Sequence, residues 1–198
     1  YPDFARFVVA SFVYRIGLNL PVALYSIYAV RDAHASNTII GLQSTAGNLA
    51  LVGSYLLWGR LAARRGHRIV LLLATAGLSF YPFATALVSQ AVWLIPATLI
   101  WGTFASGIDV SFFEGLLHTC PADRLQTFIA VNSALANLVI FLAPIAGTLL
   151  ADLVGIRVAL VSAAALSLIG SALFYLLNVA KEGAPSPRVP VRFPGRTA

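Results

Sequence analysis

Apolar residues fill six long segments of the chain, and short polar segments separate them. Each apolar segment is long enough to span the roughly 30 Å hydrocarbon core of a bilayer. The pattern therefore predicts an all-α, polytopic membrane protein with six transmembrane helices. We expect one transmembrane domain over residues 1–180, with spans at about 4–30, 38–58, 69–88, 91–117, 127–151 and 158–180.

The composition agrees with a membrane protein. The chain has 198 residues, of which 59% are hydrophobic and only 10% are charged, and its mean hydropathy is +0.86. Soluble domains carry roughly 25% charged residues. The net charge of +6 does not indicate a nucleic-acid partner, because the basic residues fall at the ends of the apolar segments.

A basic segment between the second and third spans sets the expected topology. Gly59–Arg68 reads G-R-L-A-A-R-R-G-H-R. Loops rich in Lys and Arg stay on the cytoplasmic side of a membrane. This assignment predicts a multi-pass protein of the plasma membrane with both termini in the cytoplasm.

The two ends of the chain carry separate signals. Methionine is absent, including at position 1, so we expect Tyr1 not to be the native start and the chain to be part of a longer protein. Residues 181–198 are rich in proline, glycine and basic residues, which predicts a disordered tail.

An internal repeat relates the two halves of the chain. The segments beginning at Gly59 and Gly147 share the pattern G-x-L-x-A, followed after two or three residues by G-x-R. The predicted topology places them on opposite sides of the membrane. The pattern therefore predicts three spans followed by three inverted spans, a plan found in secondary transporters.

Polar residues are distributed unequally among the spans. The first, second, fourth and fifth spans hold the embedded charges and most amides, whereas the third and sixth are expected to face lipid. A charge in the membrane costs at least about 2.5–3.5 kcal/mol unless it faces a cavity or a partner. We therefore expect a substrate or ion pathway lined by Arg15, Asn19, Gln43, Asn48, Asp109, Asn132 and Asn137.

Arg15 and Asp109 are opposite charges at similar depths. At about 1.5 Å per residue, they lie roughly 16 and 12 Å from the cytoplasmic ends of their spans. They either form a structural ion pair, bind a charged substrate together, or act separately with Arg15 facing water. The tryptophans and tyrosines are assigned mostly to interfacial belts and packing.

The basic segment and the end of the fourth span form a candidate cytoplasmic gate. Its residues are Gly59, Arg60, Arg64, Arg65, Gly66, Arg68 and Glu114. One hypothesis pairs Glu114 with Arg64 or Arg68 as a latch. The alternative is that Glu114 lies among lipid headgroups.

Three motifs resemble those of the major facilitator superfamily. Gly59–Arg68 resembles the loop signature G-x-L-a-D-r-x-G-r-r, Ala143–Gly147 resembles the G-P-x-x-G region, and Cys120–Arg124 resembles the P-x-x-R turn. The resemblance implies half of a twelve-span secondary transporter. Its partners would be the other six-helix half, a small-molecule substrate, a proton or ion, and the lipid bilayer.

Two departures from the family pattern bear on which half this is. Ala63 stands at the aspartate position of the loop signature, and the fourth span lacks the arginine found in many N-terminal halves. Both favour the C-terminal half, and an N-terminal half remains the alternative.

Other functional classes fit the sequence less well. His34, His67 and His118 fall in expected loops, no H-E-x-x-H or G-x-S-x-G motif occurs, and only one aspartate lies deep in a span. We therefore expect neither an enzyme nor a cofactor. A non-transporting membrane scaffold or receptor remains the alternative to a transporter.

Overall fold

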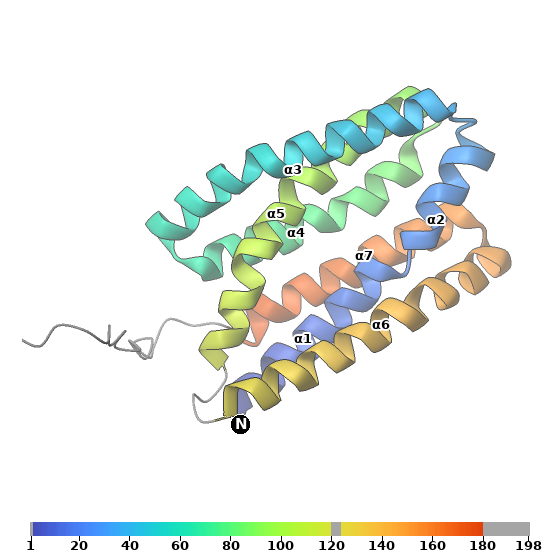
Figure 1. Ribbon diagram of the computed structural model, residues 1–198. Coiled ribbons are helices and arrows are strands. Elements are labelled where there is room, and N and C mark those ends of the chain that lie inside the picture. Colours follow the sequence, from blue (N-terminus) through green and yellow to red (C-terminus); the bar gives the residue numbers. More distant parts are fainter. Residues whose placement is uncertain (1, 120–123, 180–198) are drawn as a thin grey trace, which may run out of the picture.

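Helices make up nearly all of residues 2–119 and 124–179, which the computed structural model describes (Figure 1). They are α1 (Pro2–Asn19), α2 (Val22–Ile27), the π-helix η1 (Tyr28–Asp32), α3 (Asn37–Arg65), α4 (His67–Leu87), the 3-10 helix η2 (Ala91–Trp93), α5 (Leu94–Thr119), α6 (Leu125–Val154) and α7 (Ile156–Leu176). These residues contain no strand, so the all-α prediction is confirmed. The predicted disordered tail lies outside the described residues.

Five helical segments are long and apolar enough to cross a membrane. They are Phe4–Asp32, His67–Leu87, Ala91–Leu117, Leu125–Val154 and Ile156–Leu176. Helix α3 has 29 residues, which is roughly 43 Å of helix, but it is not among the five. Polar residues such as Gln43 and Asn48 lower its hydropathy. The second predicted span, at about residues 38–58, therefore stays a prediction.

The prediction that the basic segment Gly59–Arg68 forms a loop is wrong. Helix α3 continues to Arg65 and α4 begins at His67, so the turn is Gly66 alone. Backbone hydrogen bonds extend a helix past its apolar residues, and the chain reverses only where φ becomes positive. Gly66 has φ 83° and ψ 157°, and its amide donates to the carbonyl of Ala62 at 2.9 Å.

The turn between α6 and α7 has the same construction. Gly155 has φ 89° and ψ 151°, and its amide donates to the carbonyl of Ala151 at 2.9 Å. The predicted spans left a longer loop here, between residues 151 and 158, but α7 already begins at Ile156. The two glycine turns lie at opposite ends of the bundle (Figure 1). Both fall at the G-x-R part of the sequence repeat.

The helices form two groups that meet through α4 and α7. One group contains α3, α4 and α5, and the other contains α1, α2, α6 and α7 (Figure 1). Helix α5 packs on α3 and α4, whereas α1 packs on α6 and α7. Small residues allow these close approaches, as in other helix packings within membranes. A Cβ at Gly17 would overlap the backbone of Ser167, and one at Gly102 would overlap the carbonyl of Gly47.

Buried apolar clusters lie toward both ends of the bundle. At the end near the α3–α4 turn, the Phe7, Phe112 and Phe174 rings pack edge to face, with centroids 5.4–6.0 Å apart. At the other end, Leu24, Tyr28 and Leu160 belong to a second buried cluster. The middle of the bundle is left between these clusters.

The third and sixth spans are expected to face lipid, and only their outer faces are exposed. Leu73 and Phe80 of α4 are exposed, but 56% of the most apolar window of α4 is buried inside the bundle. The corresponding fraction for α6 is 17%. Helix α6 has the more open surface because it packs on α1, α2 and α7 along one side.

Replacement of Gly17 by alanine should separate α1 from α7. We expect Gly17→Ala to lower the free energy of unfolding by about 1–3 kcal/mol, because its Cβ would overlap backbone atoms. The matched variant Gly53→Ala places a Cβ where nothing lies within 4 Å. It should be neutral or stabilising by up to about 1 kcal/mol through helix propensity. Thermal unfolding in detergent measures both, and equal stability of the two variants would contradict this packing.

Candidate functional site

A cavity of about 250 Å³ lies in the middle of the bundle. Helices α1, α2, α4 and α5 supply its walls. The lining residues are Leu18, Asn19, Val22, Tyr25, Leu78, Tyr81, Trp101, Ala105, Ile108 and Asp109. Two of the predicted pathway residues, Asn19 and Asp109, are therefore brought together in one cavity.

Helical spacing explains how these residues reach the same space. On α5, Trp101, Ala105 and Asp109 recur every four residues and so share one face. On the opposite wall, the helix is interrupted at Leu20–Pro21, between Asn19 and Val22. Proline cannot donate a backbone hydrogen bond, so the first span is divided there into α1 and α2.

The carboxylate of Asp109 is held by a tyrosine from another helix. The hydroxyl of Tyr55 on α3 donates to Asp109 Oδ2 at 2.6 Å. Both residues are exposed in the described structure. This hydrogen bond links α3 to α5 and fixes the direction of the carboxylate, and no described group donates to its other oxygen.

Arg15 does not form an ion pair with Asp109 among the described residues. Its guanidinium carbon lies 4.7 Å from the centroid of the Phe112 ring. Its Nε is buried and has no hydrogen-bond partner among the described groups. A cation over an aromatic face is stabilised by the ring's quadrupole. In this conformation the two charges therefore interact with different side chains.

The remaining predicted pathway residues lie at different places. Gln43 of α3 lies close to the Tyr81 side chain, which lines the cavity. Asn48 of α3 and Asn137 of α6 are exposed, and Asn132 of α6 is buried. These three asparagines do not line the central cavity, because neither α3 nor α6 contributes a lining residue.

The predicted gate residues lie around the α3–α4 turn. Gly59, Arg60, Arg64 and Arg65 are exposed on the last turns of α3. Arg68 donates to Asn178 Oδ1 at 3.0 Å, which joins the start of α4 to the residues after α7. Glu114 is half-buried on α5. The latch between Glu114 and Arg64 or Arg68 stays a prediction.

Aromatic residues are the part of the site that sequence reasoning missed. Tyr25, Tyr81 and Trp101 line the cavity, although the sequence assigned such residues mostly to belts and packing. The Tyr25 and Tyr81 rings have centroids 4.6 Å apart. The available signal was the four-residue spacing that places Trp101 on the same helical face as Asp109.

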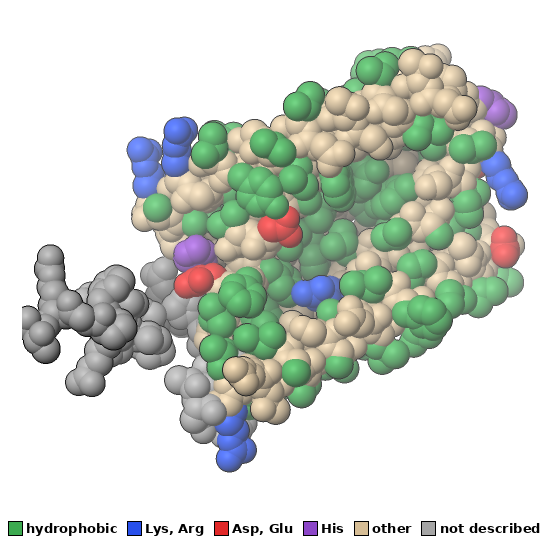
Figure 2. Space-filling view, viewed as in Figure 1, with side chains coloured by type: hydrophobic (Ala, Val, Ile, Leu, Met, Phe, Trp, Pro, Cys, Tyr) green, Lys and Arg blue, Asp and Glu red, His purple; other side chains and the backbone are tan. Residues whose placement is uncertain are grey.

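A hollow between the two helix groups is visible from the side shown in Figure 2. Hydrophobic side chains fill its interior, and single acidic and basic side chains lie beside it. Isolated charges on an apolar surface are typical of a membrane protein whose polar residues face a pathway.

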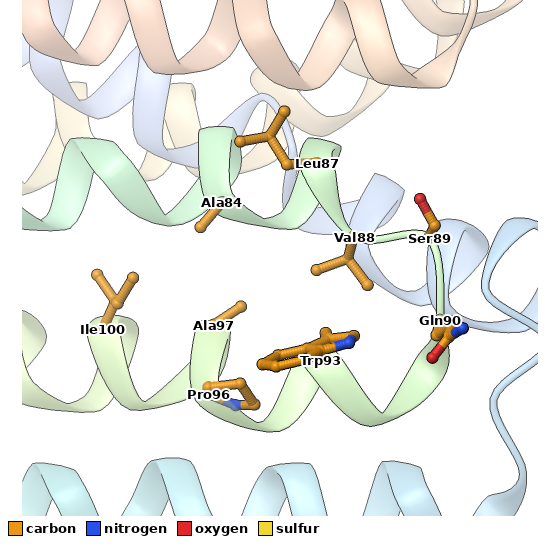
Figure 3. Close-up of a pocket in the computed structure, with 9 residues that line it drawn as sticks. All are labelled: Ala84, Leu87, Val88, Ser89, Gln90, Trp93, Pro96, Ala97 and Ile100. Atoms are coloured by element: carbon orange, nitrogen blue, oxygen red, sulfur yellow. The ribbon is translucent and has the colours of Figure 1, made fainter.

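A second cavity, of about 540 Å³, lies between the end of α4 and the start of α5 (Figure 3). Ala84, Leu87, Val88, Ser89, Gln90, Trp93, Pro96, Ala97 and Ile100 line it. It is larger than the central cavity, but it has no charged lining residue. Its walls come from consecutive parts of the chain, namely the end of α4, the loop that follows, η2 and the start of α5. Trp93 is 62% exposed there, which fits its predicted place in an interfacial belt. The central cavity is therefore the candidate site.

Loss of the Tyr55 hydroxyl should weaken the contact between α3 and α5. In a double-mutant cycle of Tyr55→Phe and Asp109→Asn, we expect a coupling free energy of about 1 kcal/mol, since a hydrogen bond to a charged group is lost. Thermal unfolding provides the measurement. The control is Tyr175→Phe, at an exposed position on α7. Its effect on the free energy of unfolding should simply add to that of Asp109→Asn. Additivity of the Tyr55 pair would show that the hydrogen bond does not stabilise the fold.

Comparison with known proteins gives the family of the chain. No curated protein matches the sequence. A family model described as the Major Facilitator Superfamily matches residues 7–197, which is most of the chain. The helical bundle and its apolar spans agree with this match. The chain therefore belongs to the Major Facilitator Superfamily.

Proposed function

We propose that this chain is one six-helix half of a twelve-span secondary transporter, which moves a small solute across the membrane by alternating access. The observation that carries this proposal is the central cavity, where Asp109 and Asn19 lie among aromatic side chains in the middle of an apolar bundle. Family membership implies membrane transport. Substrate sites of secondary transporters lie near the middle of the membrane, and this cavity lies in the middle of the bundle.

Matching contacts between helices support the predicted 3+3 inverted repeat, with α3 as the second of six spans. If the first span is matched with α5, α3 with α6 and α4 with α7, each contact has a counterpart. The packing of α3 on α5 corresponds to that of α6 on α1, and the packing of α4 on α5 corresponds to that of α7 on α1. The glycine turns at Gly66 and Gly155 correspond as well.

Exposed apolar surface on α3 and α6 supports a missing second half. Leu49 and Val52 of α3 are 69% and 65% exposed, and Phe141 of α6 is 69% exposed. A second six-helix bundle or lipid would cover such residues. Ala63, at the aspartate position of the loop signature, favours the C-terminal half.

The proposed topology places the α3–α4 turn in the cytoplasm, in a plasma membrane. Arg60, Arg64 and Arg65 are exposed there, as residues near headgroups would be. A non-transporting scaffold or receptor with the same spans is the alternative. Such a protein would not need to open its central cavity to both sides of the membrane.

Two-sided labelling of the cavity should distinguish a transporter from a scaffold. In the full-length protein with Cys120→Ser, we introduce Ala105→Cys into the cavity wall. A membrane-impermeant maleimide should modify this cysteine both in right-side-out and in inside-out vesicles, because alternating access exposes the cavity to each side in turn.

The control is Leu73→Cys, at a position that is 49% exposed on the outer face of α4. It should react from neither side, since lipid covers that face. Modification of Ala105→Cys from one side only would contradict alternating access and favour the scaffold.

A further inference from the structure

We propose that the central cavity binds a monovalent organic cation with an aromatic ring. This inference rests on the proposed transport function and names the class of substrate. It is argued from the charge, the aromatic lining and the apolar walls of the cavity.

The charge of the cavity is negative. Among its lining residues, Asp109 has the only carboxylate, and none is a lysine, an arginine or a histidine. Tyr55 donates to one carboxylate oxygen, which fixes its direction without neutralising it. Arg15 lies over Phe112 and is not part of the cavity wall. Asp109 is thus left to attract a cation from the solute.

The aromatic lining also favours a cationic ligand. Trp101, Tyr25 and Tyr81 line one space, where the Tyr25 and Tyr81 rings pack against each other with centroids 4.6 Å apart. Aromatic faces attract cations, most strongly when the ring is tryptophan and the site is shielded from water. The Tyr25 hydroxyl is buried without a hydrogen-bond partner among the described residues, so it remains available to a bound molecule.

The walls of the cavity favour a ligand with an apolar body. Leu18, Val22, Leu78 and Ile108 supply apolar walls, which favour an apolar body over a highly hydroxylated one. An aromatic ring with a cationic group combines such a body with the charge that Asp109 attracts.

Equilibrium binding of radiolabelled phenyltrimethylammonium to the full-length protein in detergent tests the proposal. This probe is permanently charged, so its own titration does not enter the measurement. We expect saturable binding, and we expect Asp109→Asn to weaken it at least about tenfold, because the carboxylate charge is lost. Benzenesulfonate, with the same ring and the opposite charge, should not compete.

Matched variants separate a direct role from loss of folding. Asp109→Glu keeps the charge and should bind better than Asp109→Asn, and Asp152→Asn, at an exposed site near the α6–α7 turn, should leave binding unchanged. Trp101→Phe should bind better than Trp101→Leu, since it keeps a π-face. Thermal unfolding of each variant reports its folding.

Two results would overturn the cation site: binding that Asp109→Asn leaves unchanged, or preferential binding of benzenesulfonate. This outcome is distinguishable from failure of the proposed transport. If Ala105→Cys is labelled from both sides but no cation binds, the transport proposal stands and this substrate class is rejected. If a cation binds in a manner that depends on Asp109 but labelling occurs from one side only, the cation site stands and alternating access is rejected.

Discussion

The need to satisfy backbone hydrogen bonds without water is the constraint on which this structure depends. In hydrocarbon, an unpaired amide or carbonyl costs several kcal/mol, so a spanning segment must form its hydrogen bonds within itself. The described helices follow this rule past the ends of their apolar runs. Helices α3 and α6 end only at Gly66 and Gly155, where a positive φ turns the chain. Polar side chains alone did not interrupt them.

Because the helices satisfy their own backbones, their packing depends on shape. Glycine and serine let α1 approach α7 and let α3 approach α5, where a larger side chain would overlap backbone atoms. A buried hydrogen bond adds a directional contact: Thr75 and Ser171 hydroxyls lie 2.9 Å apart between α4 and α7. The apolar clusters toward the two ends leave the cavity in the middle of the bundle.

The charged residues show how this packing gives a site its chemistry. Opposite charges at similar depth suggested an ion pair, but depth along a helix does not give the direction in which a side chain points. Arg15 is turned to the face of Phe112, whereas Asp109 is turned to the hydroxyl of Tyr55. Each charge is stabilised by an aromatic residue from a different helix. The carboxylate therefore stays available to the cavity.

The sequence by itself determined the helical class, the approximate positions of five apolar spans and the pattern shared by the two glycine turns, and it predicted Asn19 and Asp109 as pathway residues. These features depend on local composition and spacing, which a linear pattern contains. Only the tertiary structure decided that Tyr25, Tyr81 and Trp101 surround Asp109. It also decided that Asn48, Asn132 and Asn137 lie elsewhere. The reason is physical: a membrane helix can turn a polar or aromatic residue toward lipid, a neighbour or a cavity, and the contacts between helices set that rotation.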